Sequence, residues 1–218
     1  MKKVFFQFSL ILFAVFSFPA KGQTIFDIEF VFFKRLDADG NFNYLSLEAP
    51  TAQEQIYTLT PSLSLPEDYQ LLERSERRLE GVFNRLKTSA NMRPLLHIAW
   101  RQPLTDKDET AWLSFILSDE PHEKGLQDFI GNIRFSRNQG LLFEANISGL
   151  KEADPNIIIE PSDGQTPEQL IGYFGLEESR KVKINTLNYF DHPTMGILVK
   201  ITPYQATIEE QEALQQQQ

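Results

Sequence analysis

The chain contains no cysteine, so no disulfide bridge can hold its fold together. Its stability must therefore come from a hydrophobic core, and the roughly 195 residues that follow the first segment are enough to form one. The lack of cysteine also excludes a lipoprotein, because lipid attachment needs a cysteine next to the cleavage site.

The first 22 residues have the organisation of a secretory signal peptide. Two lysines begin the segment, an apolar run from Val4 to Phe18 follows, and small residues precede the expected cleavage after Gly22. A retained membrane anchor is the alternative, but the run is shorter than a spanning helix requires. We expect a signal peptide at 1–22, a single periplasmic domain at 23–206 and an acidic, Gln-rich tail at 207–218 that is disordered or a frayed helix.

The chain is acidic, with 30 Asp and Glu residues against 21 Lys and Arg residues and a formal charge of −9. Removal of the three lysines in the first segment would make the charge about −12. Nucleic acid and anionic membrane surfaces are therefore poor partners, and we expect no membrane insertion of the mature chain. A local basic segment comprises Arg74, Arg77, Arg78, Arg85 and Lys87, which we interpret mainly as a solvated helix face.

Hydrophobic periodicity predicts the main elements. Alternation of Phe26, Ile28, Phe30 and Phe32 with other residues predicts a strand over 24–34 that is buried on one face. Apolar residues at helical spacing predict a long amphipathic helix over 66–88, after a loop that extends from Leu36 to Leu63.

Later segments predict further strands and a second helix. Thr166 and Pro167 suit the start of a short helix that ends near Gly175. The predicted strands are 95–101, 111–117, 129–137 and 140–147, with a hairpin at 138–140, and a final pair at 180–190 and 196–203. The expected fold class is α+β: an antiparallel β-sheet packed with one long amphipathic helix and a short second helix, in a single domain.

Motifs for catalysis or metal binding are weak. The segment Asp37–Glu48 has the oxygen spacing of a calcium loop, but Phe42 replaces the required glycine and a predicted strand precedes it, so a polar turn is the alternative. The histidines, His97, His122 and His192, lack zinc-site spacing, and the chain has no GxSxG elbow. Paired glycosidase carboxylates cannot be located among 30 acidic residues. We expect no enzyme, no metal site and no cofactor.

The segment from Pro94 to Pro103 favours binding instead. Aromatic faces stack on sugars, and Arg101 and Gln102 offer donors for the carboxylates and amides of a muropeptide. The alternative is that Trp100 and Trp112 are core aromatics on adjacent strands.

Three stretches resemble the CsiV family of Gram-negative periplasmic proteins. They are FVFFKR at 30–35, RPLLHIAWRQP at 93–103 and LNYFDHPTMGILVKITPY at 187–204. The motif residues of this resemblance are Leu96, His97, Trp100, Arg101, Gln102, Pro103, Tyr189, Asp191, His192, Pro193 and Gly196.

The resemblance implies a non-enzymatic peptidoglycan-binding protein that supports cell-wall synthesis and cell shape. It also implies an outer-membrane lipoprotein activator and a class A penicillin-binding protein as partners. The candidate binding residues are His97, Trp100, Arg101, Gln102, Tyr189, Asp191 and His192. A protein–protein scaffold of the synthesis machinery, with little direct affinity for peptidoglycan, is the alternative function.

Overall fold

The computed structural model describes residues 24–37, 57–119, 128–152 and 171–205. Ten strands, one α-helix and one 3-10 turn form in this part of the chain. Their bounds are β1 Ile25–Arg35, β2 Thr58–Thr60, β3 Gln70–Leu71, η1 Arg74–Glu76, α1 Glu80–Lys87, β4 Met92–Pro103, β5 Leu113–Leu117, β6 Phe129–Arg137, β7 Leu141–Glu152, β8 Ile171–Lys181, β9 Leu187–Asp191 and β10 Met195–Pro203.

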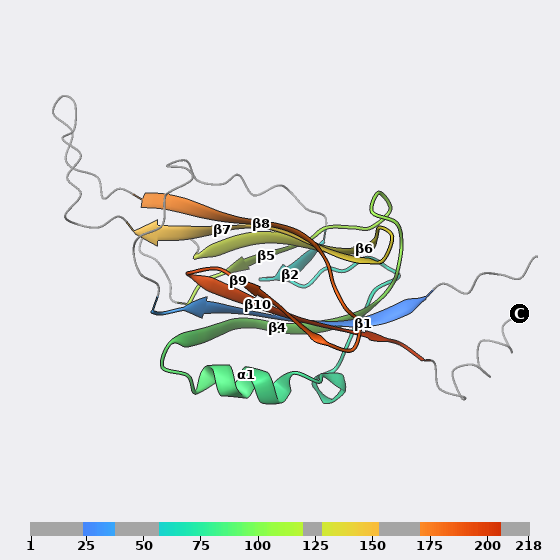
Figure 1. Ribbon diagram of the computed structural model, residues 1–218, viewed down its shortest axis with the longest axis horizontal. Coiled ribbons are helices and arrows are strands. Elements are labelled where there is room, and N and C mark those ends of the chain that lie inside the picture. The colour runs from blue at the N-terminus through green and yellow to red at the C-terminus, as the bar shows by residue number, and fades with distance from the viewer. Residues whose placement is uncertain (1–23, 38–56, 120–127, 153–170, 206–218) are drawn as a thin grey trace, which may run out of the picture.

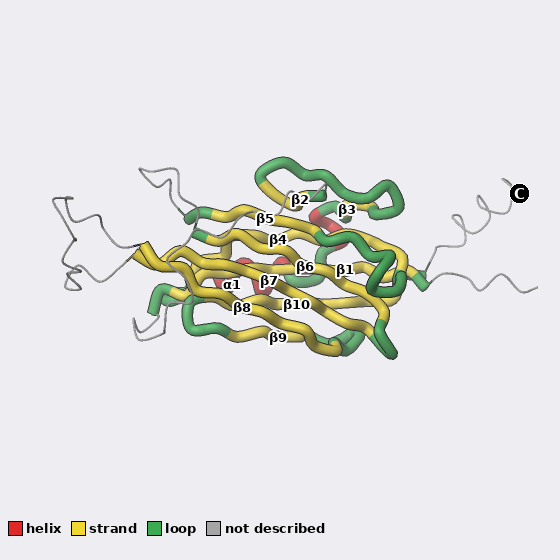
Figure 2. Tube along the Cα trace, turned by 90° about the horizontal axis from the view of Figure 1, so that it is seen from above, coloured by secondary structure: helices red, strands yellow, loops and turns green. Residues whose placement is uncertain are grey.

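Two five-stranded sheets lie face to face. Sheet A has the strand order β3-β4-β1-β10-β9, and sheet B has the order β2-β5-β6-β7-β8. Neighbouring strands are antiparallel except for β2 and β5, which are parallel. Figure 1 shows the two layers with α1 on the outer side of sheet A, and Figure 2 shows the strands of both sheets running in similar directions.

Aromatic side chains fill the space between the sheets. Phe32 of β1 contacts Phe115 of β5 and Phe129 of β6, with ring centroids 5.5 and 4.9 Å apart. Phe143 of β7 contacts Phe190 of β9 at 4.4 Å. Each such pair adds about 0.5–1.5 kcal/mol beyond its buried area, so the sequence's many phenylalanines account for a core that needs no disulfide.

The helix packs on the outer face of sheet A. Val31, Phe33 and Leu198 of the sheet form a second apolar cluster with Leu79 and Leu86. The predicted alternation in β1 is confirmed. The strand is nevertheless buried on both faces rather than one, because Leu79 and Leu86 pack on the outer side of β1.

The predicted α+β fold is wrong, because the described chain is mostly β and its one α-helix has eight residues. Within the predicted helix 66–88, Tyr69 packs against the core between the sheets, whereas Leu79 and Leu86 pack on the outer face of sheet A. A single straight helix cannot reach both sites. The segment instead pairs at β3, makes a 3-10 turn and becomes helical at Glu80.

The predicted second helix is also wrong in its described part. Residues 171–175 begin β8, which pairs with β7 along its whole length. Phe174 is buried there, with its ring 6.2 Å from that of Phe129. Cross-strand pairing and burial of this ring therefore override the local helix signal.

Both predicted hairpins are confirmed. Strands β6 and β7 pair around the turn at 138–140, and β9 and β10 pair around the turn after Asp191. The last strand pair is shorter than predicted, since residues up to Lys181 belong to β8. No helix in the described ranges is long and apolar enough to cross a membrane. The predicted signal peptide and tail lie outside these ranges.

A glycine on β6 tests the packing between the sheets. Gly131→Ala should lower the free energy of unfolding by about 1–3 kcal/mol, because the new methyl group would lie 2.3 Å from Cζ of the buried Phe115 ring. Urea unfolding followed by circular dichroism measures the change.

The matched control is Gly81→Ala in α1, where nothing lies within 4 Å of the added methyl group. This variant should be unchanged or more stable by up to about 1 kcal/mol, since alanine favours helix. Equal effects at the two positions would contradict the close packing of the Phe115 ring on Gly131.

Candidate functional site

Strand alternation sends the side chains of β4 to opposite faces of sheet A. His97 and Arg101 lie on the outer face, opposite Val31 and Asp27 of β1. Trp100 belongs to the core between the sheets, and Gln102 is buried on the same side. The predicted binding residues of this strand therefore do not form one surface.

The inward pair joins the two sheets. Trp100 is 0% exposed, and its indole Nε1 donates a 2.7 Å hydrogen bond to Oε1 of Gln102. Gln102 in turn donates from Nε2 to the carbonyl oxygen of Phe135 on β6 at 2.9 Å. The Trp100 ring has no free face for a ligand, which agrees with the alternative that it is a core aromatic.

A buried carboxylate lies at the centre of the outer face. Glu29 is 5% exposed, and its Oε1 is 2.7 Å from Nε2 of His97, which donates because a carboxylate only accepts. The same carboxylate accepts the backbone N–H groups of Arg78 and Leu79, each at 2.8 Å. Glu29 therefore fixes the residues that lead into α1, and His97 has a structural partner.

Arg101 lies at the end of β4, in a polar groove of about 640 Å³. Its guanidinium donates to both oxygens of Asp27, at 2.7 and 3.3 Å, and Glu76 lies 3.8 Å away. Its Cζ is 3.4 Å from the centre of the Tyr204 ring. Burial acts to lower the pKa of Arg101, but the hydrogen bond and charge of Asp27 raise that pKa above its ordinary value.

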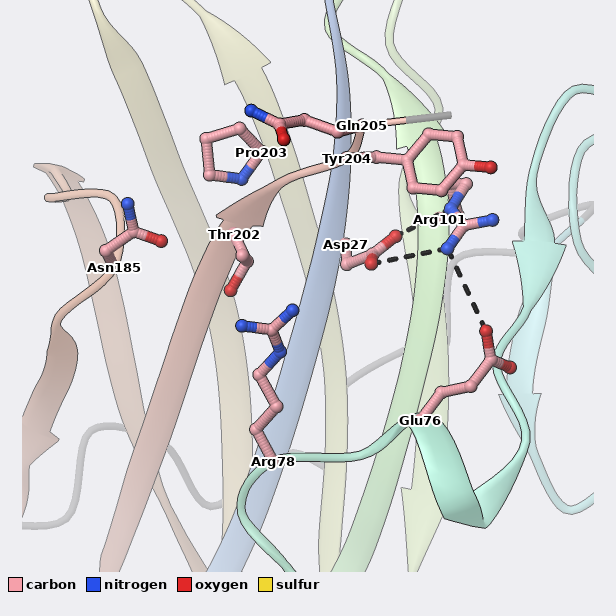
Figure 3. Close-up of a pocket in the computed structure, with 9 residues that line it drawn as sticks. All are labelled: Asp27, Glu76, Arg78, Arg101, Asn185, Thr202, Pro203, Tyr204 and Gln205. Atoms are coloured by element: carbon pink, nitrogen blue, oxygen red, sulfur yellow. Dashed lines mark hydrogen bonds and ion pairs between the residues drawn. The ribbon is translucent and has the colours of Figure 1, made fainter. Parts of the chain in front are cut away.

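Figure 3 shows how the groove is built from separate parts of the chain. Asp27 comes from β1, Arg101 from β4 and Tyr204 from the residues after β10. Glu76 and Arg78 come from the segment between β3 and α1, and Asn185 comes from the loop before β9. The groove thus offers two guanidinium groups, two carboxylates, amides and a phenol, which suit a charged, amide-rich ligand.

A second polar cluster surrounds Tyr189 on the outer face of β9. The residue is 43% exposed, and its ring stacks on that of Phe33 with centroids 6.4 Å apart. Its hydroxyl donates to Asp191, which also accepts a 3.0 Å hydrogen bond from Arg35. Partial burial, with the hydrogen bond and charge of Asp191, raises the pKa of Tyr189 to about 12. The exposed ring is therefore neutral and held in one orientation.

His192 lies in the turn between β9 and β10. Its ring stacks on Phe174 with centroids 5.1 Å apart, and its Nδ1 is 2.9 Å from Oγ1 of Thr194. Burial lowers the pKa of His192, so the imidazole is neutral at neutral pH. These contacts hold the turn between β9 and β10 in place.

Arg101, Tyr189 and Asp191 lie on the same face of sheet A. Arg101 lies in the groove, whereas Tyr189 and Asp191 form the second cluster on β9. Thr202 in the groove and Leu198, the partner of Tyr189, are four residues apart on β10, so roughly 13 Å separates the two places along the strand. This face is the candidate functional site.

Sequence reasoning missed several residues of this face, among them Asp27, Glu29 and Arg78. Asp27 and Glu29 could have been found as acidic residues at alternate positions of an apolar strand. Arg78 was treated as one charge among many on a helix face. Its place in the groove depends on Glu29, which is 49 residues away in sequence.

The segment Asp37–Glu48, which has the oxygen spacing of a calcium loop, lies outside the described residues after Asp37. Among the residues that are described, no group of three or more His, Cys, Asp or Glu side chains is placed to hold a metal ion.

Glu29→Gln tests the link between the sheet and α1. The amide oxygen cannot replace both carboxylate oxygens, so we expect the free energy of unfolding to fall by about 1–3 kcal/mol and amide hydrogen exchange in α1 to accelerate. Exposed Glu177 on β8 supplies the matched control, and Glu177→Gln should change stability by less than about 0.5 kcal/mol. Unchanged stability and exchange in Glu29→Gln would disprove the link.

Comparison with known proteins identifies the family. The model of the family described as "Peptidoglycan-binding protein, CsiV" matches residues 5–204, which include every described strand. Curated proteins and solved structures gave no match. Since the family match extends over most of the 218 residues, the chain belongs to the CsiV family of peptidoglycan-binding proteins.

Proposed function

We propose that this protein is a periplasmic, non-enzymatic accessory protein that binds peptidoglycan and supports cell-wall synthesis and cell shape. The match to the CsiV family over residues 5–204 is the observation that carries the proposal. The outer face of sheet A supplies a suitable surface, since it combines an exposed aromatic ring with a polar, charged groove.

Tyr189 is the proposed glycan contact. Aromatic rings bind the apolar faces of sugars, while neighbouring polar groups bind the hydroxyls. Here the ring is supported from below by Phe33, and the Asp191 carboxylate and the Arg35 guanidinium lie beside its hydroxyl. A ring that is already oriented loses little freedom when it binds.

The groove favours binding over wall cleavage. A glycosidase needs one carboxyl group that donates a proton and a second that acts on the sugar or on water. Both oxygens of Asp27 already accept from Arg101, and Glu76 accepts the backbone N–H of Glu73 at 2.9 Å. Neither carboxylate is therefore well placed for acid catalysis.

Sedimentation with purified sacculi tests the function. Wild-type protein should sediment with the sacculi, and Tyr189→Ala should bind about two- to tenfold more weakly because it removes the ring. Tyr189→Phe is the matched control, since it keeps the stacked ring and should retain most of the binding. Wild-type protein that stays wholly in the supernatant, beside a known binder that sediments, would refute the proposal.

The proposal also includes partners in cell-wall synthesis. The resemblance to the CsiV family implies a lipoprotein activator and the class A penicillin-binding protein that it controls. The protein would support that activation while bound to the wall.

A scaffold with little affinity for peptidoglycan is the second candidate. The formal charge of −9 favours it, because an acidic protein suits a protein partner better than an anionic wall. Crosslinking in cells separates the two candidates. Joint capture of peptidoglycan and the lipoprotein activator supports the wall-bound accessory protein, and capture of the activator alone supports the scaffold.

A further inference from the structure

The two arginines of the groove differ in their partners. Arg101 is paired with Asp27 and lies against Tyr204, and 14% of its side chain is exposed. Arg78 is exposed, and its guanidinium has no hydrogen bond or ion pair within the described ranges of the chain. Figure 3 shows its side chain reaching toward Asp27 and Thr202 in the middle of the groove.

The backbone of Arg78 is nevertheless held firmly. Its N–H donates to Oε2 of Glu29 at 2.8 Å, and the next residue, Leu79, donates to Oε1 and is 4% exposed. The side chain therefore extends over the groove from a fixed point. A cation placed in this way loses less entropy on binding than one on a loose loop.

The charges in the groove favour one kind of ligand group. Asp27 and Glu76 both lie within 4 Å of the Arg101 guanidinium and offset its charge, whereas no acid among the described residues lies within 4 Å of the Arg78 guanidinium. A planar guanidinium binds a carboxylate through two parallel hydrogen bonds. The overall charge of −9 opposes the approach of a dense polyanion, so the separate carboxylates of a small peptide fit better than nucleic acid or anionic lipid.

We infer that the groove binds the peptide stem of peptidoglycan and that Arg78 pairs with a free carboxylate of that stem. This inference rests on the proposed function and assigns its ligand chemistry, with the stem in the groove and the glycan at Tyr189. Asn185 and Gln205 line the groove and supply amide groups for the peptide bonds of the stem. Arg101 is a positioning residue, since it holds Asp27 and Tyr204 in place.

Calorimetric titration of the full chain tests the inference with three probes. They are a soluble disaccharide-peptide, the same compound with its stem carboxylates amidated, and the disaccharide without peptide. Arg78→Gln should weaken binding of the first probe about tenfold, as expected for loss of a charged hydrogen bond. Amidation should weaken binding to wild-type protein by a similar factor and should have little further effect on Arg78→Gln.

The matched control is Arg85→Gln, which removes the same charge from an exposed arginine of α1. This variant should bind the first probe as wild-type protein does. Thermal unfolding of both variants, which change exposed side chains, checks that the fold is intact.

Equal affinity of Arg78→Gln and Arg85→Gln for the disaccharide-peptide would overturn the inference. Wild-type protein that binds the amidated compound or the bare disaccharide as tightly as the first probe would overturn it too. In both cases sedimentation with sacculi would still support peptidoglycan binding. If wild-type protein binds neither sacculi nor the disaccharide-peptide, the inference and the proposed function are overturned together.

Discussion

The buried carboxylate of Glu29 is the interaction on which the outer half of the structure depends. An ionised group inside an apolar surface is costly unless it is fully hydrogen-bonded, and Glu29 meets this need with His97 and two backbone N–H groups. Those N–H groups belong to the residues that precede α1. The requirement to satisfy one charge therefore places the helix over Val31 and Leu198 and buries the second apolar cluster.

Strand alternation gives the residues of the β4 motif separate roles. His97 completes the environment of Glu29 on the outer face, while Trp100 and Gln102 tie sheet A to sheet B through the carbonyl group of Phe135. Arg101, near the end of the strand, is the member of this motif that lines the groove. A stretch whose sequence resembles a binding motif thus contains one residue that lines the groove, Arg101. Its other residues form two structural contacts, one with Glu29 and one with sheet B.

Sequence periodicity identified most strands and both hairpins because these depend on local alternation and turn residues. It could not show that the strands divide into two sheets, since alternation is the same for either sheet. The prediction of a long helix was wrong because Tyr69 and Leu79 have helical spacing yet pack on opposite sides of sheet A. The place of Arg78 likewise depends on a contact with Glu29 that no local pattern reveals. Tyr189 and Asp191 were found through the family resemblance, whereas their support by Phe33 and Arg35 required the fold.

The attachment of Arg78 to Glu29 makes groove occupancy and helix docking linked equilibria. When the segment around α1 opens locally, the Glu29 contact is lost and Arg78 leaves the groove with it. A ligand that binds the docked form alone must then oppose this opening by its own binding free energy. The wall would thus act as a stabilising ligand of its binding protein, and the segment between β3 and α1 would be most ordered where peptidoglycan is abundant.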